Sequence, residues 1–365
     1  MAGTPSREPP ADVDLLVVGA GPAGLATAIY AARAGLGVRV LEARPGPVDK
    51  ACGEGLMPSA VRGLRELGVR LEGRRIRGIR YTDGNRCADA FFRNGCGLGV
   101  RRTVLQAAMS TAAERAGVQI TRHRAQVVAS DDVGVSVDGY RARHLVVADG
   151  LHSGFRRALG LEPGRQPGTR NGPGTRNGPG RRSGVRWGLR RHFAVEPWTD
   201  LVEVHWAAHA EAYVTPVGPR LVGVALLSGE RGSFDEQLAG FPTLRALLGS
   251  AVGGPVRGAG PLRQRSTARV HGRVLLVGDA AGYVDALTGE GIAVSVACAR
   301  QLVDCLVAGT PQAYERRWSA TTRRYRTLTS MLLWAGRRPV LASRIVPTAV
   351  ALPGLFGMLV RQVAR

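Results

Sequence analysis

The segment VVGAGPAG places Gly19, Gly21 and Gly24 directly after an apolar strand and before an Ala-rich helical stretch. Glycines at this GxGxxG spacing allow a tight turn and let a pyrophosphate approach the free N–H groups of the helix N-terminus. The next strand ends at Glu42, near the offset at which an acidic side chain binds a ribose hydroxyl. A surface acid after an unrelated glycine turn is the alternative, but strand, helix and acid together predict a dinucleotide-binding βαβ unit.

Two later segments identify which dinucleotide this unit binds. VADGLHSGFR carries Asp149 and Gly150 directly after an apolar strand, and LLVGDAAGYVDALTGEGI carries Gly278 and Asp279 at the end of another. The first resembles the aspartate-glycine motif of aromatic-hydroxylase-type flavoproteins, and the second resembles their glycine-aspartate motif. The resemblance implies FAD, with Asp279 on the ribityl chain. A helix beginning near Glu290 would direct its N-terminus at the flavin ring and stabilise negative charge there.

The remaining cofactor candidates flank these motifs. Arg102, in VRRTVLQAAM, falls where such flavoproteins place an arginine near FAD, with Arg101 as the one-residue alternative and a surface arginine as the simpler interpretation. Gly289 and Gly291 belong to the glycine-aspartate segment and are assigned to the same site. The chain has a single GxGxxG, so we expect NADH or NADPH to dock transiently as the reductant.

A narrower resemblance is to geranylgeranyl-reductase-like flavoproteins. DKACGEGLMP, which contains Cys52, is similar to their lysine-x-cysteine-glycine segment, and the ending LTGEGI fits the same branch. Those reductases carry a tryptophan and a Phe-Pro pair on a strand lining the substrate cavity. This chain has EAYVTPVG instead, so Tyr213, Thr215 and Pro216 are predicted to line the cavity, and the departure weakens the assignment to reductases.

Candidates for catalysis come from the same segments. Cys52 is a proton donor or redox partner near the flavin, or a small residue that lets the backbone approach the ring. Glu54 and Glu290 are candidates for positioning or proton transfer, although acids at helix starts serve the helix dipole. His205 and His209 stand four apart on a predicted strand, a spacing that does not predict a metal site.

The motifs predict an α/β protein with a glutathione-reductase-like Rossmann FAD-binding domain, a smaller antiparallel-sheet substrate domain and a helical C-terminus. The expected divisions are 11–75, 101–160 and 265–310 for the FAD-binding domain, 76–100 and 184–264 for the substrate domain, 165–183 for a flexible low-complexity loop that repeats GTRNGP, and 311–365 for the helical C-terminal region. Prolines 339, 347 and 353 should divide that last region into short helices. It would cover a lipophilic substrate tunnel, rest on an anionic membrane surface as a peripheral contact, or simply pack against the domain.

Charge and cysteine content indicate which partners and which cellular compartment to expect. The net charge of +22 arises almost entirely from arginines spread along the chain, which does not favour a nucleic-acid surface. Five cysteines without a CxxC pair, and a polar N-terminus without an apolar signal core, predict a cytoplasmic protein, with the C-terminal region as the candidate for membrane association.

Two reactions fit the flavin. The preferred prediction is an FAD-dependent monooxygenase that hydroxylates or epoxidises a lipophilic small molecule in secondary metabolism, with NAD(P)H as reductant. The alternative is a geranylgeranyl-reductase-like enzyme that delivers hydride to a C=C bond of a prenyl chain. A flavin-binding protein without turnover is a second alternative, which three separate cofactor motifs oppose.

Overall fold

The computed structural model describes residues 13–164, 185–336 and 338–364. The predicted loop 165–183 lies outside these residues. A first sheet has the order β17-β18-β11-β1-β2-β8, in which the four pairs from β18 to β8 are parallel. Its strands are β1 (Val13–Val18), β2 (Val38–Glu42), β8 (Gln119–Arg122), β11 (Tyr140–Val147), β17 (Val270–His271) and β18 (Val274–Leu276), and the hairpin β9 (Val128–Ser130) and β10 (Val135–Val137) extends it through β11.

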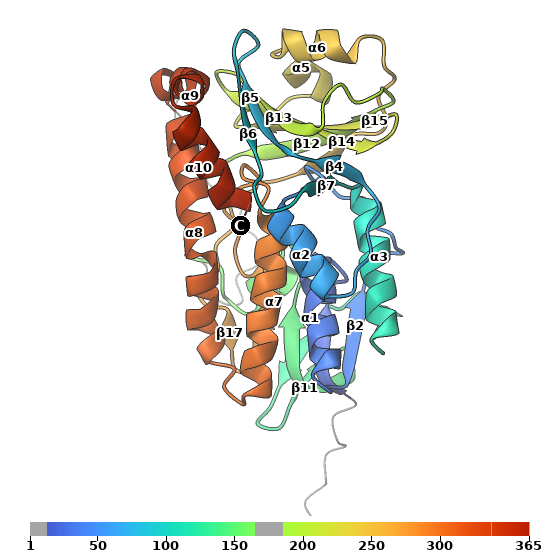
Figure 1. Cartoon of the computed structure of the whole chain (residues 1–365). Helices are drawn as coiled ribbons and strands as arrows, with labels where there is room; N and C mark the ends of the chain where they lie inside the picture. The colour runs from blue at the N-terminus through green and yellow to red at the C-terminus, as the bar shows by residue number, and fades with distance from the viewer. Residues whose placement is uncertain (1–12, 165–184, 337, 365) are drawn as a thin grey trace, which may run out of the picture.

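Three helices cover one face of this sheet. The helix α1 (Pro22–Arg33) packs between α3 (Arg102–Arg115) and α7 (Gly291–Val307), as Figure 1 shows. The central strands carry continuous apolar runs, such as LLVV in β1, because parallel strands are buried on both faces. This is the predicted Rossmann-type unit, and it brings the carboxyl ends of β1, β11 and β18 to one edge of the sheet.

A second sheet has the order β16-β12-β15-β14-β13-β5-β6. Its strands are β5 (Gly78–Thr82), β6 (Cys87–Phe91), β12 (Trp187–Phe193), β13 (Leu201–Trp206), β14 (Ala210–Gly218), β15 (Leu221–Ser228) and β16 (Arg257–Ala259). All neighbours pair antiparallel, as predicted, except β13 and β5, which pair parallel. The short helices α5 (Phe234–Leu238) and α6 (Pro242–Leu248) cover its outer face in Figure 1 and share a hydrophobic core with it.

A three-stranded sheet, β3-β7-β4, and the helix α2 (Pro58–Glu66) join the two larger sheets. The strands are β3 (Gly55–Leu56), β4 (Arg74–Ile76) and β7 (Gly97–Gly99). Gly99 lies so close to β14 that a Cβ there would stand 1.8 Å from the carbonyl oxygen of Pro216. This contact fixes the loop before β3, which carries Cys52, against the second sheet.

The C-terminal region forms α8 (Ala313–Gly336), α9 (Pro339–Ala351) and α10 (Pro353–Ala364). In Figure 1, α8 runs along the molecule from the first sheet to the second, where α9 and α10 pack on β5 and β6. Pro339 and Pro353 occupy first helical positions, which suit proline. The prediction that Pro347 ends a helix is wrong, because α9 continues through it. An interior proline removes one backbone hydrogen bond, and the packed helix tolerates that loss.

Candidate active site

The GxGxxG glycines serve two different purposes. A Cβ on Gly24 would lie 2.0 Å from the carbonyl oxygen of Gly19, and one on Gly19 would lie 2.4 Å from that of Ala148. These two glycines are therefore required by the fold itself. A Cβ on Gly21 would meet nothing within 4 Å and would project into the cavity that Gly21 lines. Gly21 thus leaves room for a ligand at the N-terminus of α1, as a pyrophosphate site needs.

A cavity of about 420 Å³ adjoins this turn at the ends of β1, β2 and β11. Glu42 lines it, and its two carboxylate oxygens accept hydrogen bonds from the backbone N–H groups of Ala20 (2.9 Å) and Arg44 (3.0 Å). Each oxygen keeps a second lone pair for a ligand hydroxyl. The held carboxylate and the volume of the cavity fit the adenosine end of a dinucleotide.

A larger cavity of about 1700 Å³ begins at the same turn and extends between the two sheets to the C-terminal helices. Seven of the residues predicted to approach the cofactor lie along its first part, and Gly278 lies between the lining residues Val277 and Asp279 in the chain. The members of the set that line this cavity are Gly21, Arg102, Asp149, Gly150, Asp279, Gly289 and Gly291. The sequence motifs therefore converge on one continuous space.

Four charged side chains meet in this first part: Arg44, Lys50, Arg102 and Asp279. Burial lowers the pKa of Lys50 and of Arg102, and burial raises the pKa of Asp279. The Nη1 atom of Arg102 is buried and has no hydrogen-bond partner among the described residues, whereas Arg101 is exposed. Arg44 and Lys50 are exposed along the cavity and Arg102 is buried, so an excess of positive charge beside an unsatisfied buried guanidinium fits an anionic ligand such as a pyrophosphate.

Arg156 joins the two flavoprotein motifs. Its side chain is 1% exposed and donates through Nη1 to the carbonyl oxygens of Asp279 (3.3 Å) and Ala280 (3.1 Å), in the short helix η1 (Gly278–Ala280). It also donates through Nη2 to the carbonyl oxygen of Leu151 (3.1 Å). The end of β11 is thereby tied to the end of β18, and the arginine is structural.

Asp149 starts the turn after β11. Its Oδ2 atom accepts from the N–H of Gly154 (2.9 Å), the first residue of α4 (Gly154–Ala158). Its Oδ1 atom is buried without a hydrogen-bond partner among the described residues, and burial raises the pKa of the carboxyl. A buried, half-satisfied carboxylate on a cavity wall fits a ligand that brings a donor to it.

Glu54 is held on both sides, an arrangement that the sequence did not reveal. Its Oε1 atom accepts from the N–H of Arg102 (2.8 Å) at the start of α3, and its Oε2 atom lies 2.5 Å from Nε2 of His192 on β12. Arg190, two residues earlier on the same face of β12, contacts Nδ1 of His192 (3.0 Å) and forms an ion pair with Asp49. With both oxygens engaged, Glu54 positions the loop 49–54, which favours the helix-start interpretation.

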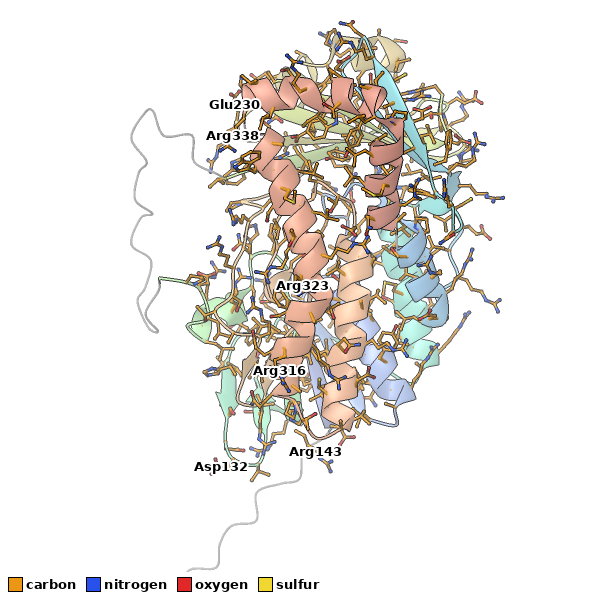
Figure 2. The ribbon with its side chains drawn as sticks, turned by 60° about the vertical axis from the view of Figure 1, so that its left-hand side comes forward. Asp132, Arg143, Glu230, Arg316, Arg323 and Arg338 are labelled. Atoms are coloured by element: carbon orange, nitrogen blue, oxygen red, sulfur yellow. The ribbon has the colours of Figure 1, made fainter. Side chains whose placement is uncertain are left out.

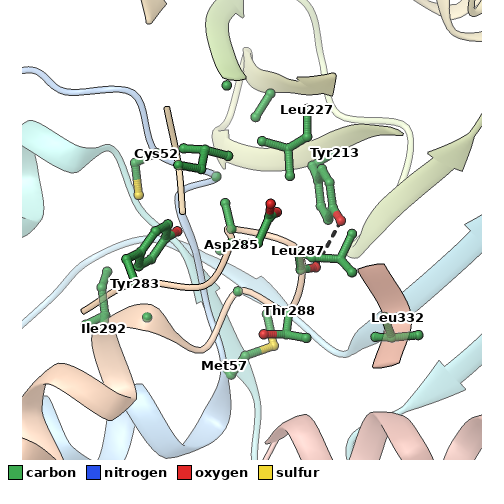
Figure 3. A pocket seen from close by; sticks show the side chains of 18 of the residues that line it. Cys52, Met57, Tyr213, Leu227, Tyr283, Asp285, Leu287, Thr288, Ile292 and Leu332 are labelled. Carbon is green, nitrogen blue, oxygen red and sulfur yellow. Dashed lines mark hydrogen bonds between the residues drawn. The ribbon is translucent and has the colours of Figure 1, made fainter. Parts of the chain in front are cut away.

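Cys52 lines the large cavity in the middle of this loop. Its Sγ atom accepts from the N–H of Glu54 (3.4 Å), and burial raises the pKa of the thiol. The thiol therefore stays protonated at neutral pH, unlike the low-pKa cysteines of redox-active sites. Figure 3 shows Cys52 and Tyr283 on the same side of the cavity.

Two of the three predicted substrate-cavity residues line the cavity. The hydroxyl of Tyr213 donates to the carbonyl oxygen of Leu287 (2.9 Å; Figure 3), and that of Thr215 donates to the carbonyl oxygen of Gly53 (2.8 Å). Pro216 is instead at the contact with β7. Both hydroxyls therefore hold loops of the site in place, and the apolar parts of the two side chains form part of the cavity wall.

A buried charged group interrupts the apolar wall near Tyr213. Arg186 forms ion pairs with Glu211 and with Asp285 (3.7 Å), and all three side chains are buried. Burial raises the pKa of Glu211. Asp285 lines the cavity, and Figure 3 shows its carboxylate between the Cys52 side and the Tyr213 side. These residues carry no local motif, so the sequence alone did not single them out.

The glycine turn lies on a parallel sheet, beside a cavity of the size of an adenosine. A group of cationic side chains and a long cavity lie beyond it. This arrangement defines a dinucleotide-binding flavoprotein of the glutathione-reductase-like class. Residues 12–172 match the FAD binding domain family. The menaquinone reductase of Mycolicibacterium smegmatis is 30% identical over 335 residues, which cover 84% of this chain and 79% of that protein.

Digeranylgeranylglycerophospholipid reductase 1 of Methanopyrus kandleri is 29% identical over 325 residues, 79% of each chain. The chain belongs to the superfamily of FAD-dependent oxidoreductases, and it is therefore a flavin-dependent enzyme. Among solved structures, a geranylgeranyl bacteriochlorophyll reductase-like protein from Thermoplasma acidophilum has a TM-score of 0.75 at 21% identity, covering 92% of this chain and 90% of that one. That likeness concerns the fold.

Proposed function

We propose that this enzyme reduces carbon–carbon double bonds in the prenyl chain of a lipophilic substrate. The observation that carries the proposal is the cavity, which continues from the cofactor-binding residues to aliphatic side chains of α9 and α10, including Leu341, Ile345 and Leu355. A pocket for one small ligand usually measures about 300–1,000 Å³. At about 1700 Å³ this one has room for a flavin and a long apolar chain beside it.

The whole-length relatives support the same reaction class. Two proteins that align with 79–84% of the chain are named reductases, one of menaquinone and one of a digeranylgeranyl phospholipid. Cys52 lies in the segment that resembles the reductase branch and lines the cavity. These observations support our choice of reduction over the oxygenation that the sequence motifs alone favour.

The chemistry that bound FAD would supply is hydride for one carbon of the double bond, with NADH or NADPH as the reductant. Arg102 and Lys50 would hold the pyrophosphate, and the N-terminus of α7 at Gly291 would stabilise negative charge on the ring. Cys52 gives its thiol proton to the second carbon and regains one from solvent, because burial keeps the thiol protonated. The aliphatic wall excludes water from the reacting atoms.

Oxygenation of a lipophilic ring or alkene is the second candidate function. The motif at Asp149 and Gly150 resembles that of aromatic hydroxylases, and a water-excluding cavity suits oxygen transfer as well as hydride transfer. Both reactions need the same reduced cofactor, and they differ in whether dioxygen is consumed.

Geranylgeraniol separates the two reactions, because it offers double bonds but has no quinone that could take electrons directly. The FAD-loaded enzyme is reduced under argon and mixed with geranylgeraniol; we expect flavin reoxidation and a product that has gained two hydrogen atoms. A parallel reaction contains isotopically labelled dioxygen. A product carrying one labelled oxygen atom, with no anaerobic reoxidation, would overturn the reductase in favour of the monooxygenase. A protein that neither oxidises NAD(P)H nor changes the substrate would be a flavin binder.

A further inference from the structure

The C-terminal helices expose an unusual number of large apolar side chains. We call this set the C-terminal apolar surface: Met331, Trp334, Val340, Val350, Leu352, Leu355, Met358 and Leu359, which are 39–74% exposed. Val340 is the most exposed of them at 74%. Large contiguous apolar surfaces on folded proteins mark contact sites, so we expect another molecule to bind this surface.

The segment of the chain that forms this surface carries charge of one sign. After Glu315 the sequence contains ten arginines and no acidic residue. Figure 2 shows Arg338 at the end of α8 that adjoins α9, whereas Arg323 and Arg316 lie progressively farther from that end along α8. Arg344 is exposed on α9, and Arg338 stacks on the ring of Trp334 at 3.9 Å. An apolar face bordered by arginines complements anionic headgroups above acyl chains, and it would repel the same basic face of a second copy.

The same side chains form the opening of the large cavity. Met331, Trp334, Leu352, Leu355 and Leu359 are exposed to solvent and also line the cavity. Arg344 lines it as well. An apolar molecule that enters here passes from the C-terminal apolar surface directly into the interior.

The helices are shaped to lie on a bilayer. Among the described residues no single helix is long and apolar enough to cross a membrane. Only together do α9 and α10 reach that length and apolar character, and they are bent by 105° at their junction. Two short apolar helices at this angle, carrying only Arg344 and Arg361 as charged residues in the described range, fit the headgroup boundary with their apolar faces inward.

We propose that the C-terminal apolar surface docks on an anionic lipid bilayer, so that the cavity opens toward the acyl chains and receives its substrate from them. The docking stands on the surface alone, whereas the delivery of a prenyl substrate rests on the proposed function. A lipid-embedded substrate would then reach the flavin without crossing water.

Vesicle flotation tests the docking without any prenyl compound, so its outcome is independent of the reaction. The FAD-loaded protein is floated with vesicles of phosphatidylcholine alone or mixed with phosphatidylglycerol. We expect binding to the anionic vesicles. The double variant Val340→Ser/Met358→Ser, at exposed positions outside the cavity lining, should bind about tenfold more weakly, and Arg338→Gln several-fold more weakly.

Matched controls remove the effect of the general positive charge. Val133→Ser/Val252→Ser changes two other exposed valines, and Arg143→Gln changes an exposed arginine at the far end of the molecule (Figure 2). Both should float like the unchanged protein. Absence of flotation with anionic vesicles, or equal losses in controls and surface variants, would overturn the proposal. So would a dimer in solution that Val340→Ser/Met358→Ser converts to monomers, because a second copy would then cover the surface.

Discussion

The Nε2 atom of His192 lies 2.5 Å from Oε2 of Glu54, joining strand β12 of the second sheet to the loop that carries Cys52. The contact connects residues that are 138 positions apart in the chain. It fixes the distance between the second sheet and the loop 49–54, which both line the large cavity.

His192→Phe should therefore destabilise the protein. The Glu54 carboxylate would stay buried without this partner, which costs about 3 kcal/mol. Glu54→Gln/His192→Phe removes the charge as well and should recover part of the loss. Urea unfolding of the three proteins measures this, and a double variant no more stable than His192→Phe would contradict the explanation.

Arg102→Gln should weaken FAD binding by about tenfold to a hundredfold, because it removes a charge-assisted contact to the pyrophosphate. Arg101→Gln is the matched control, since this neighbouring arginine is exposed. Titration of each apoprotein with FAD gives the dissociation constants. Equal affinities would assign Arg102 to the structure of α3 instead of the cofactor site.

Cys52→Ser should lower the turnover number about 10²-fold or more while leaving FAD affinity unchanged, if the thiol supplies the proton. Because burial raises the pKa of Cys52, the protonated thiol persists as the pH increases. The rate should stay level through neutral pH and fall only above the usual titration range of a thiol. Cys87→Ser, at an exposed cysteine, serves as control. A pH profile shared by Cys52→Ser and the unchanged enzyme would return Cys52 to a packing role.

We expect Gly21→Val to impair FAD binding and Gly24→Ala to impair folding. Gly21→Val puts its side chain into open space, so the apoprotein should fold normally and lose FAD. Gly24→Ala puts a Cβ 2.0 Å from a backbone oxygen and should lower the free energy of unfolding by about 1–3 kcal/mol even without FAD. Thermal unfolding of both apoproteins, paired with FAD titration, checks the contrast. An unstable Gly21→Val apoprotein would contradict the conclusion that the space beside Gly21 is open to a ligand.

Glu290, the residue before α7, should make stability depend on pH. Burial raises the pKa of its carboxyl to about 7, so the folded protein binds a proton that the unfolded chain releases at lower pH. Stability should fall as the pH rises from about 4.5 to 7, by up to about 3 kcal/mol. Glu290→Gln should remove this dependence and stabilise the protein at pH 8. A variant with the same stability profile as the unchanged protein would contradict the assignment.

Neighbouring residues in the sequence are sufficient to predict the turns and single elements that they form. The turn at Gly21, the strand before Asp279 and the helix after Glu290 are each encoded by adjacent residues, and the structure contains all three. Arg190 and His192 were missed because β12 reaches the loop 49–54 only through tertiary pairing. No spacing in the sequence reports such a contact.

The C-terminal region shows a different limit. Pro347 predicts a helix end from its chemistry, yet α9 continues because packing against the second sheet compensates for one missing hydrogen bond. The parallel pairing of β13 with β5 was likewise hidden, since their residues come from separate stretches of the chain.

The guanidinium of Arg156 has consequences for the order in which the protein matures during synthesis. Its acceptors at Asp279 and Ala280 follow it by more than a hundred residues. A nascent chain that has emerged only as far as Arg156 therefore carries this buried-type cation without its acceptors at Asp279 and Ala280. This wall of the cavity is complete only after the segment through Ala280 has left the ribosome, so we expect FAD to bind late in the synthesis of each new chain.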